Sequence, residues 1–197
     1  MKGQTQIVTT MLLTMVTVAV VGTVYFYGLP LIEKNKDIAT LQKTEDFIKL
    51  LDDKIKIVAN GGSAELPFNI PGLFIFNNSN GTIEIKVKTR RTIYATGAEV
   101  PLVGDLEGGN VWGVNKQEII YVKAEKVGNA FVNSYNLNYK QLEGNDCYKI
   151  VLESKTGGDI VTEEGHNIII SHVGIDSSEK CGGTKTLYKS IVQIAIV

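Results

Sequence analysis

The sequence predicts an α+β protein, in which a long N-terminal helix, hydrophobic and then amphipathic, precedes an antiparallel β-sandwich-like head. Three observations predict this fold. Lys2 is the only charged residue among the first 32, while the other 19 of the 20 basic residues and all 21 acidic residues follow. Beyond residue 62 the hydrophobic repeat changes from that of a helix to the two-residue repeat of strands. The net charge of −1 attracts no polyanion, so we expect no nucleic-acid partner.

The first half of the helix has the composition of a membrane span. Residues 7–29 carry no charge and would extend about 35 Å as a helix, against a hydrocarbon core about 30 Å thick. A secretory signal peptide has a shorter apolar core and a cleavage site after it, and neither is visible after residue 29. Tyr25, Phe26 and Tyr27 lie where interfacial aromatics are found, and Lys2 lies at the opposite end. We therefore expect a retained span in the cell membrane, with the head outside.

Threonines make this segment more polar than a leucine-rich anchor. Thr10, Thr14 and Thr17 fall on one helical face, which suits packing against other helices. Alternatively, the hydroxyls donate to carbonyls one turn earlier in their own helix. The sequence leaves both interpretations open.

The helix is expected to continue past Pro30 with a kink, because a proline ring disturbs the preceding turn without ending the hydrophobic pattern. The run Asn60-Gly61-Gly62 then supplies a C-terminal stop. Apolar residues at spacings of three, four and seven define the buried face: Ile38, Leu41, Ile48, Leu51, Ile55 and Val58. The second half of the helix is therefore predicted to lie against the head.

Short alternating runs separated by Asn-Gly and Gly-Gly turns predict a head of seven or more strands. The predicted strands cover residues 73–76, 83–88, 93–94, 119–123, 148–153, 167–173 and 187–197. The last run is apolar on both faces from Ile191 to the end of the sequence. We expect it to be a central strand covered on one side by the amphipathic helix.

Cys147 and Cys181 are the only cysteines. In an exported domain an even pair predicts a disulfide, which would close a loop of about 35 residues and contribute roughly 3–4 kcal/mol. Two separate buried thiols are the alternative, since spacing alone does not settle pairing. Asn77 and Asn80 each begin an N-glycosylation sequon on a predicted turn, although a hairpin turn has the same composition.

The sequence contains no recognisable catalytic or metal-binding motif. His166 and His172 share one predicted strand about 20 Å apart, too far for one metal ion. The acidic residues Asp105, Glu107, Glu163 and Glu164 are interpreted as solvated loops, Trp112 as a core residue in a glycine-rich loop, and the Arg90-Arg91 doublet as a solvated turn. We expect no enzyme, no cofactor, and no catalytic or metal site.

The beginning Met1-Lys2-Gly3-Gln4, followed at once by the apolar helix, resembles the class III signal peptide of archaeal type IV pilins and archaellins. In that family a very short basic leader is removed on the cytoplasmic side and the hydrophobic helix stays in the mature protein. The resemblance implies cleavage between Gly3 and Gln4, with Lys2 as the basic residue that the prepilin peptidase reads. The chain would then consist of a leader at 1–3, a helix at 4–60 and a head at 61–197.

Three features depart from the family pattern. The leader has only three residues. Val8 stands at the fifth mature position, where many pilins carry a glutamate that pairs with a neighbouring amino terminus, and Gln6 stands where a small hydroxyl residue is common. The resemblance still implies a structural subunit, major or minor, of an archaeal type IV pilus-like surface filament involved in adhesion. Its partners would be the membrane, its own copies or other pilin subunits through the helix, and the assembly machinery. The alternative is a single-span anchored extracellular binding domain that does not polymerise.

Overall fold

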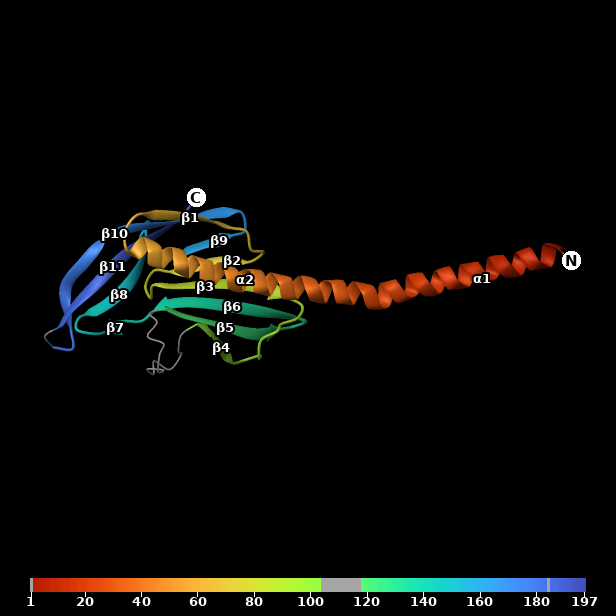
Figure 1. Cartoon of the computed structure of the whole chain (residues 1–197), viewed down its shortest axis with the longest axis horizontal. Helices are drawn as coiled ribbons and strands as arrows, with labels where there is room; N and C mark the ends of the chain where they lie inside the picture. Colours follow the sequence, from red (N-terminus) through yellow and green to blue (C-terminus); the bar gives the residue numbers. More distant parts are fainter. Residues whose placement is uncertain (1, 104–117, 184) are drawn as a thin grey trace.

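A single long helix projects from a β-rich head in the computed structural model, which describes residues 2–103, 118–183 and 185–197 (Figure 1). Helix α1 (Lys2–Thr23) continues through a π-helical turn, η1 (Val24–Gly28), into α2 (Leu29–Ala59). The N-terminus lies at the far tip of the helix and the C-terminus on the head (Figure 1). The predicted α+β fold, with a long N-terminal helix followed by a sheet head, is confirmed.

Eleven strands of the described chain form the head, in two sheets. One sheet has the order β1, β10, β11, β8, β7, and the other has the order β4, β5, β6, β3, β2, β9. The strands are β1 (Ser63–Phe68), β2 (Leu73–Asn77), β3 (Thr82–Thr89), β4 (Glu99–Val103), β5 (Glu118–Val127), β6 (Ala130–Tyr139), β7 (Leu142–Glu143), β8 (Cys147–Ser154), β9 (Ile160–Glu163), β10 (His166–Cys181) and β11 (Lys185–Ile196).

Pairing between the named strands is antiparallel except between β11 and β8, which run parallel. After β8 the chain crosses to the other sheet as β9, returns as β10, and turns back as β11, which then lies beside β8 in the same direction. The prediction of an antiparallel head therefore needs this one correction. An alternating pattern reports which face of a strand is buried but not the direction of its neighbour.

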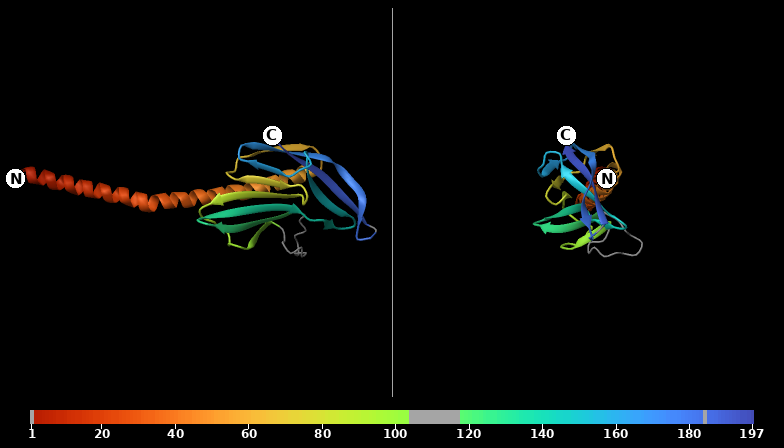
Figure 2. Two further views of the ribbon diagram at one scale, coloured as in Figure 1. Left: turned by 180° about the vertical axis from the view of Figure 1, so that it is seen from behind. Right: turned by 90° about the vertical axis from the view of Figure 1, so that its left-hand side faces the viewer.

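The second half of the helix supplies part of the core. Helix α2 contacts β1, β10 and β11 of the first sheet and β3, β5 and β6 of the second. Figure 2, in its end-on view, shows strands of the head around the helix. Its buried apolar residues are Leu41, Phe47, Ile48, Leu51, Ile55 and Val58, and they belong to one cluster with residues of both sheets. The predicted burial of the amphipathic helix face is thus confirmed from Leu41 to Val58, while Ile38 is only half-buried and Phe47 is an addition to the predicted face.

Most predicted strands are present, but not all. The run at 93–94 is not a strand, because Ile93 lies in a bend and Tyr94 turns its hydroxyl toward the helix to bind Glu45. Strands β1, β4, β6, β7 and β9 were not predicted. The final run is confirmed as a central strand, since β11 lies between β10 and β8 and contacts α2.

Candidate functional site

The helix outside the head carries most of the exposed large hydrophobic side chains of the described chain. Its large apolar side chains are between 46 % and 77 % exposed, from Leu29 at the low end to Tyr27 at the high end. Soluble proteins rarely expose contiguous apolar surface of this extent without a membrane or a protein partner to cover it. By length and composition this helix can cross a membrane, as the sequence predicts.

Threonine hydroxyls on this surface donate within their own helix. Thr14 Oγ1 lies 3.0 Å from the Thr10 carbonyl oxygen, Thr17 Oγ1 lies 2.8 Å from that of Leu13, and Thr23 Oγ1 lies 2.8 Å from that of Ala19. The structure thus agrees with the back-bonding interpretation, and a hydroxyl satisfied in this way costs little in lipid. Packing of the threonine face against other helices stays a prediction.

The bend of the helix lies just before Pro30. Proline has no N–H to donate to the carbonyl of Phe26, and its ring crowds that carbonyl, so the preceding turn widens into η1. Figure 1 shows the axis changing direction between α1 and α2 while the helix continues. The predicted kink is present, and no break in the helix separates the apolar half from the half inside the head.

Tyrosine hydroxyls fix α2 to the second sheet. The hydroxyl oxygen of Tyr135, on β6, lies 3.0 Å from the Leu41 carbonyl oxygen and 3.1 Å from the Tyr94 hydroxyl oxygen. Tyr94 in turn donates to Glu45 over 3.0 Å, and Glu45 accepts from Lys49 over 2.6 Å. These bonds join buried or half-buried groups, so they set the helix in one rotation and one height relative to the sheet.

Burial and hydrogen bonding shift the pKa values of this network. Removal from water raises the pKa of Tyr94 to about 12, and the Glu45 carboxylate beside it acts in the same direction. Burial likewise raises the pKa of Tyr135. The hydrogen bond from Lys49 lowers the pKa of Glu45. At neutral pH the network therefore holds two neutral phenols and one carboxylate.

Further contacts secure the helix near its C-terminal end. Tyr139 donates to Asp52 over 2.8 Å, and Asp52 is paired with Lys56 at 2.7 Å. Ser190 Oγ on β11 donates to the Ala59 carbonyl oxygen over 2.6 Å. The C-terminal part of α2, from Asp52 to Ala59, is thus bonded to both sheets.

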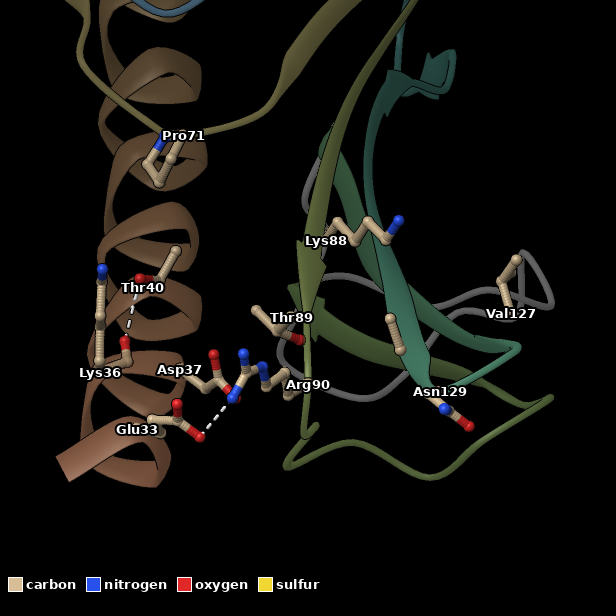
Figure 3. A pocket seen from close by; sticks show the side chains of 11 residues that line it. Glu33, Lys36, Asp37, Thr40, Pro71, Lys88, Thr89, Arg90, Val127 and Asn129 are labelled. Carbon is tan, nitrogen blue, oxygen red and sulfur yellow. Dashed lines mark hydrogen bonds and ion pairs between the residues drawn. The ribbon is translucent and has the colours of Figure 1, made fainter. Parts of the chain in front are cut away.

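The Arg90-Arg91 doublet lies against the helix, so its interpretation as a solvated turn was incomplete. Arg90, whose side chain is 70 % exposed, pairs with Glu33 at 2.5 Å, and the backbone N–H of Arg91 donates to Asp37 over 3.1 Å. A cleft of about 650 Å³ lies between α2, β3 and the β5–β6 turn, and Figure 3 shows Glu33, Asp37 and Arg90 at its lower end. The head therefore contacts the helix directly after its uncharged segment.

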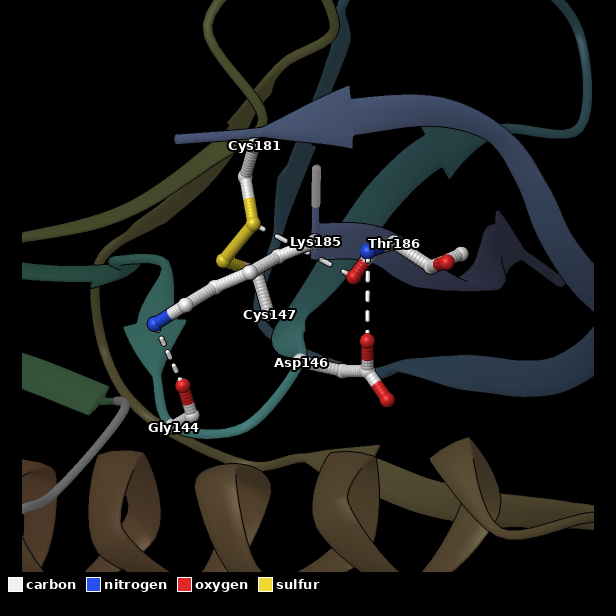
Figure 4. Close-up of a disulfide and its surroundings, with 6 residues drawn as sticks. All are labelled: Gly144, Asp146, Cys147, Cys181, Lys185 and Thr186. Atoms are coloured by element: carbon white, nitrogen blue, oxygen red, sulfur yellow. Dashed lines mark hydrogen bonds between the residues drawn. A yellow bond between two sulfur atoms is a disulfide. The ribbon is translucent and has the colours of Figure 1, made fainter. Parts of the chain in front are cut away.

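Cys147 and Cys181 form a disulfide with a Cα–Cα distance of 6.4 Å, which confirms the predicted pair. The bond joins the start of β8 to the end of β10 at the edge of the head far from α1 (Figures 1 and 4). Lys185 donates to the Gly144 carbonyl oxygen over 2.6 Å and Thr186 N–H to Asp146 over 3.2 Å. The disulfide and these bonds connect the β10–β11 hairpin to the β7–β8 turn.

A shallow groove of about 350 Å³ lies at the same distal end, where the first sheet extends past the last turn of α2. Tyr148 and Tyr188 stack in it with ring centroids 5.5 Å apart. Tyr148 is 52 % exposed and Ile175, which also lines the groove, is 66 % exposed. The pattern of the sequence did not single out this groove, because its residues come from three strands and the end of the helix.

The two predicted glycosylation sites differ in their surroundings. Asn80 is exposed in the β2–β3 turn. Asn77 is half-buried, and its side-chain oxygen accepts from Ser79 Oγ over 2.7 Å and from the backbone N–H groups of Ser79 and Asn80. The Asn80 sequon is therefore the more accessible, and use of either stays a prediction.

The remaining candidates do not converge on a site in the described residues. His166 and His172 both lie on β10, and Glu163 and Glu164 are exposed where β9 turns into β10. No group of three or more metal-ligating side chains occurs in the described ranges. Asp105, Glu107 and Trp112 lie outside the described residues. Lys2, Gly3 and Gln4 lie in the first turns of α1, and no side-chain geometry is described for them.

Comparison with known proteins leaves the chain without an assigned family. No protein-family model, no curated protein and no solved structure gives a significant match. The geometry defines a β-rich head carried on a long apolar helix.

Proposed function

We propose that this protein is a structural subunit of an archaeal type IV pilus-like surface filament, with its apolar helix as the assembly element. The observation that carries the proposal is the continuity of the helix: one helical element runs from its apolar tip to the centre of the head. A filament subunit needs this rigidity, because the position of each helix in the filament then fixes the position of its head. An anchored receptor has no such need, since a flexible linker would serve it equally well.

Two further features support the proposal. The exposed helix surface combines aliphatic side chains with internally bonded threonines, so it is stable in lipid before assembly and can pack against identical helices afterwards. The start Met1-Lys2-Gly3-Gln4 resembles a class III leader directly before the apolar part of this helix. Val8 replaces the glutamate of many pilins, and docking of such a helix would rest on apolar packing.

The second candidate function is an anchored binding domain that does not polymerise. The observation that favours it is the distal groove, in which the stacked Tyr148 and Tyr188 face outward at the end of the head farthest from the apolar helix. In this function α1 would remain in lipid and the groove would take an extracellular ligand.

Mass spectrometry of native membranes and of sheared surface material separates the two functions. A filament subunit should begin at Gln4 and occur in the sheared fraction, and peptides covering Asn77 and Asn80 would report glycans in the same experiment. A Gly3→Val variant, expected to block the leader peptidase, should keep Met1 or Lys2 and disappear from the sheared fraction. A wild-type protein that keeps Met1 or Lys2 and stays with membranes would contradict the filament proposal and favour the anchored domain.

A further inference from the structure

The end of the head nearest α1 is strongly basic. We define the membrane-proximal rim as residues 33–37 of α2, residues 88–91 at the end of β3 and residues 126–129 around the β5–β6 turn. Its charged residues are Lys34, Lys36, Lys88, Arg90, Arg91 and Lys126 against Glu33 and Asp37. Six basic residues thus face two acidic ones in a chain whose net charge is −1. The rim therefore carries a local positive charge, although the chain as a whole is slightly negative.

The basic groups of the rim are available to a partner. Arg91 and Lys126 are exposed, and neither has an acidic side chain within ion-pair distance in the part of the chain that the structure describes. The nearest further acid in the sequence, Glu125, pairs with Lys123 at 2.7 Å. Arg90 keeps 70 % of its side chain exposed although it contacts Glu33. The rim therefore presents uncompensated positive charge.

The length of helix beyond Tyr27 sets the distance of the rim from the membrane interface. At about 1.5 Å per residue, Glu33 lies about 9 Å beyond Tyr27 along the helix. The polar layer on each side of the hydrocarbon is about 5–8 Å thick. Asp37 lies about 6 Å farther out than Glu33. Because Arg90 contacts Glu33 and Arg91 contacts Asp37, the head is held to the helix here, and the rim begins at the outer edge of the lipid headgroups when Tyr27 is at the interface and extends outward from it.

Apolar side chains accompany the charges. Val127, at the tip of the β5–β6 turn, is 56 % exposed, and Ile93, in the β3–β4 loop, is 50 % exposed. Figure 3 shows the β3–β4 loop passing the level of Glu33 at the end of the cleft where the helix leaves the head. Long basic side chains with interspersed aliphatic ones suit a headgroup layer, because the charges meet phosphates while the apolar groups leave water.

We propose that the membrane-proximal rim binds the anionic headgroups of the leaflet from which the head emerges and so holds the unassembled subunit upright on the membrane. This inference rests on the membrane-embedded stage of the proposed function. Assembly would then exchange the lipid contacts of the rim for contacts within the filament.

The test uses the full chain reconstituted in vesicles of phosphatidylcholine alone or mixed equally with phosphatidylglycerol. A fluorophore on Val127→Cys reports the rim, the same fluorophore on Ile175→Cys reports the distal end, and nitroxide-labelled headgroups quench a nearby fluorophore. We expect quenching at 127, stronger with the anionic lipid and weakened by molar salt, and none at 175. Reversing two charges, Arg91→Glu with Lys126→Glu, should remove the difference between the lipids, whereas Lys155→Glu with Lys180→Glu should leave it unchanged.

The outcomes separate the two proposals. If the protein floats with vesicles but the fluorophore at 127 is no more quenched than the one at 175, or is quenched equally on both lipids, the rim inference is overturned while the membrane anchor stands. If the chain does not float with vesicles at all, the membrane stage of the proposed function and the rim inference fall together.

Discussion

At the scale of single residues, the hydroxyl groups of two tyrosines decide how the helix is held in the head. Tyr135 is fully buried on β6, and its hydroxyl donates to the Leu41 carbonyl oxygen of α2. That carbonyl also accepts the hydrogen bond of the helix itself. Tyr94 completes the contact by bonding both Tyr135 and Glu45. An apolar core alone would let the helix slide or rotate, and these directional bonds select one setting.

The Tyr135→Phe variant removes the hydroxyl and keeps the ring in the core. We expect it to lower the free energy of unfolding by about 1–2 kcal/mol, because the Tyr94 hydroxyl and the helix carbonyl lose a partner. Chemical denaturation of the full chain in detergent measures this loss. Tyr121→Phe is the matched control, since Tyr121 makes no hydrogen bond through its hydroxyl to any described residue. Equal effects of the two variants would contradict the role of Tyr135.

The same network predicts how stability depends on pH. The folded pKa of Tyr94 is raised from 10.0 to about 12, so the stabilisation is complete below pH 10 and is lost as the pH rises from 10 to 12. For Glu45 the folded pKa is lowered, so its contribution is present above pH 4.5 and is lost as the pH falls below that value. Denaturation at a series of pH values measures the free energy of unfolding and so reports its loss at both alkaline and acidic pH. Tyr94→Phe should make the loss of stability at alkaline pH less steep, while the part due to Tyr135 and Tyr121, whose pKa values are also raised by burial, remains; an unchanged slope would disprove this assignment.

At the scale of elements, sequence patterns identify β2, β3, β5, β8, β10 and β11 but not β6. Strand β6 alternates as a strand should, yet the first of its buried positions is Asn133, whose side-chain nitrogen donates to Thr89 Oγ1. A polar residue at an inward position makes the alternation invisible to a hydrophobicity pattern. Its partner, Thr89, lies on β3, which only the folded sheet brings beside β6.

The π-helical turn before Pro30 gives the element-scale prediction. In Pro30→Ala the new N–H can donate to the carbonyl of Phe26, so η1 should revert to α-helix and the bend should decrease. Spin labels on Val16→Cys and Leu50→Cys, both exposed, measure the end-to-end distance, which should lengthen. Leu31→Ala keeps the proline and should leave the distance unchanged. A distance in Pro30→Ala equal to that of the wild type would show that the bend has another cause.

At the scale of the whole molecule, the helix and the head are not separable at residue 60. Apolar residues of α2 complete the core between the sheets, and each buried side chain of this size contributes about 1.5–3 kcal/mol. Six such side chains contribute about 9–18 kcal/mol, which is as large as the whole stability of about 5–15 kcal/mol that a typical domain possesses. The structural unit of the head therefore begins within α2.

This unit predicts the behaviour of two truncated chains. A fragment of residues 33–197 keeps α2 almost entirely and should give a cooperative thermal unfolding transition in the absence of detergent. A fragment of residues 61–197 lacks the helix and should show no cooperative transition and should aggregate through the exposed core. Calorimetry and analytical ultracentrifugation distinguish these results. Cooperative folding of residues 61–197 would contradict a core shared between helix and head.

The sequence by itself determined the long helix, its apolar and amphipathic halves, the kink near Pro30 and a β-rich head, because these features depend on local composition and periodicity. It also limited Cys147 and Cys181 to one possible intramolecular pair. The tertiary structure alone decided that β11 runs parallel to β8, that Tyr135 and Tyr94 fix the helix, and that the basic residues at 34–36, 88–91 and 126 meet at one end of the head. Each of these depends on segments far apart in the chain, and only packing of the sheets around α2 brings those segments together.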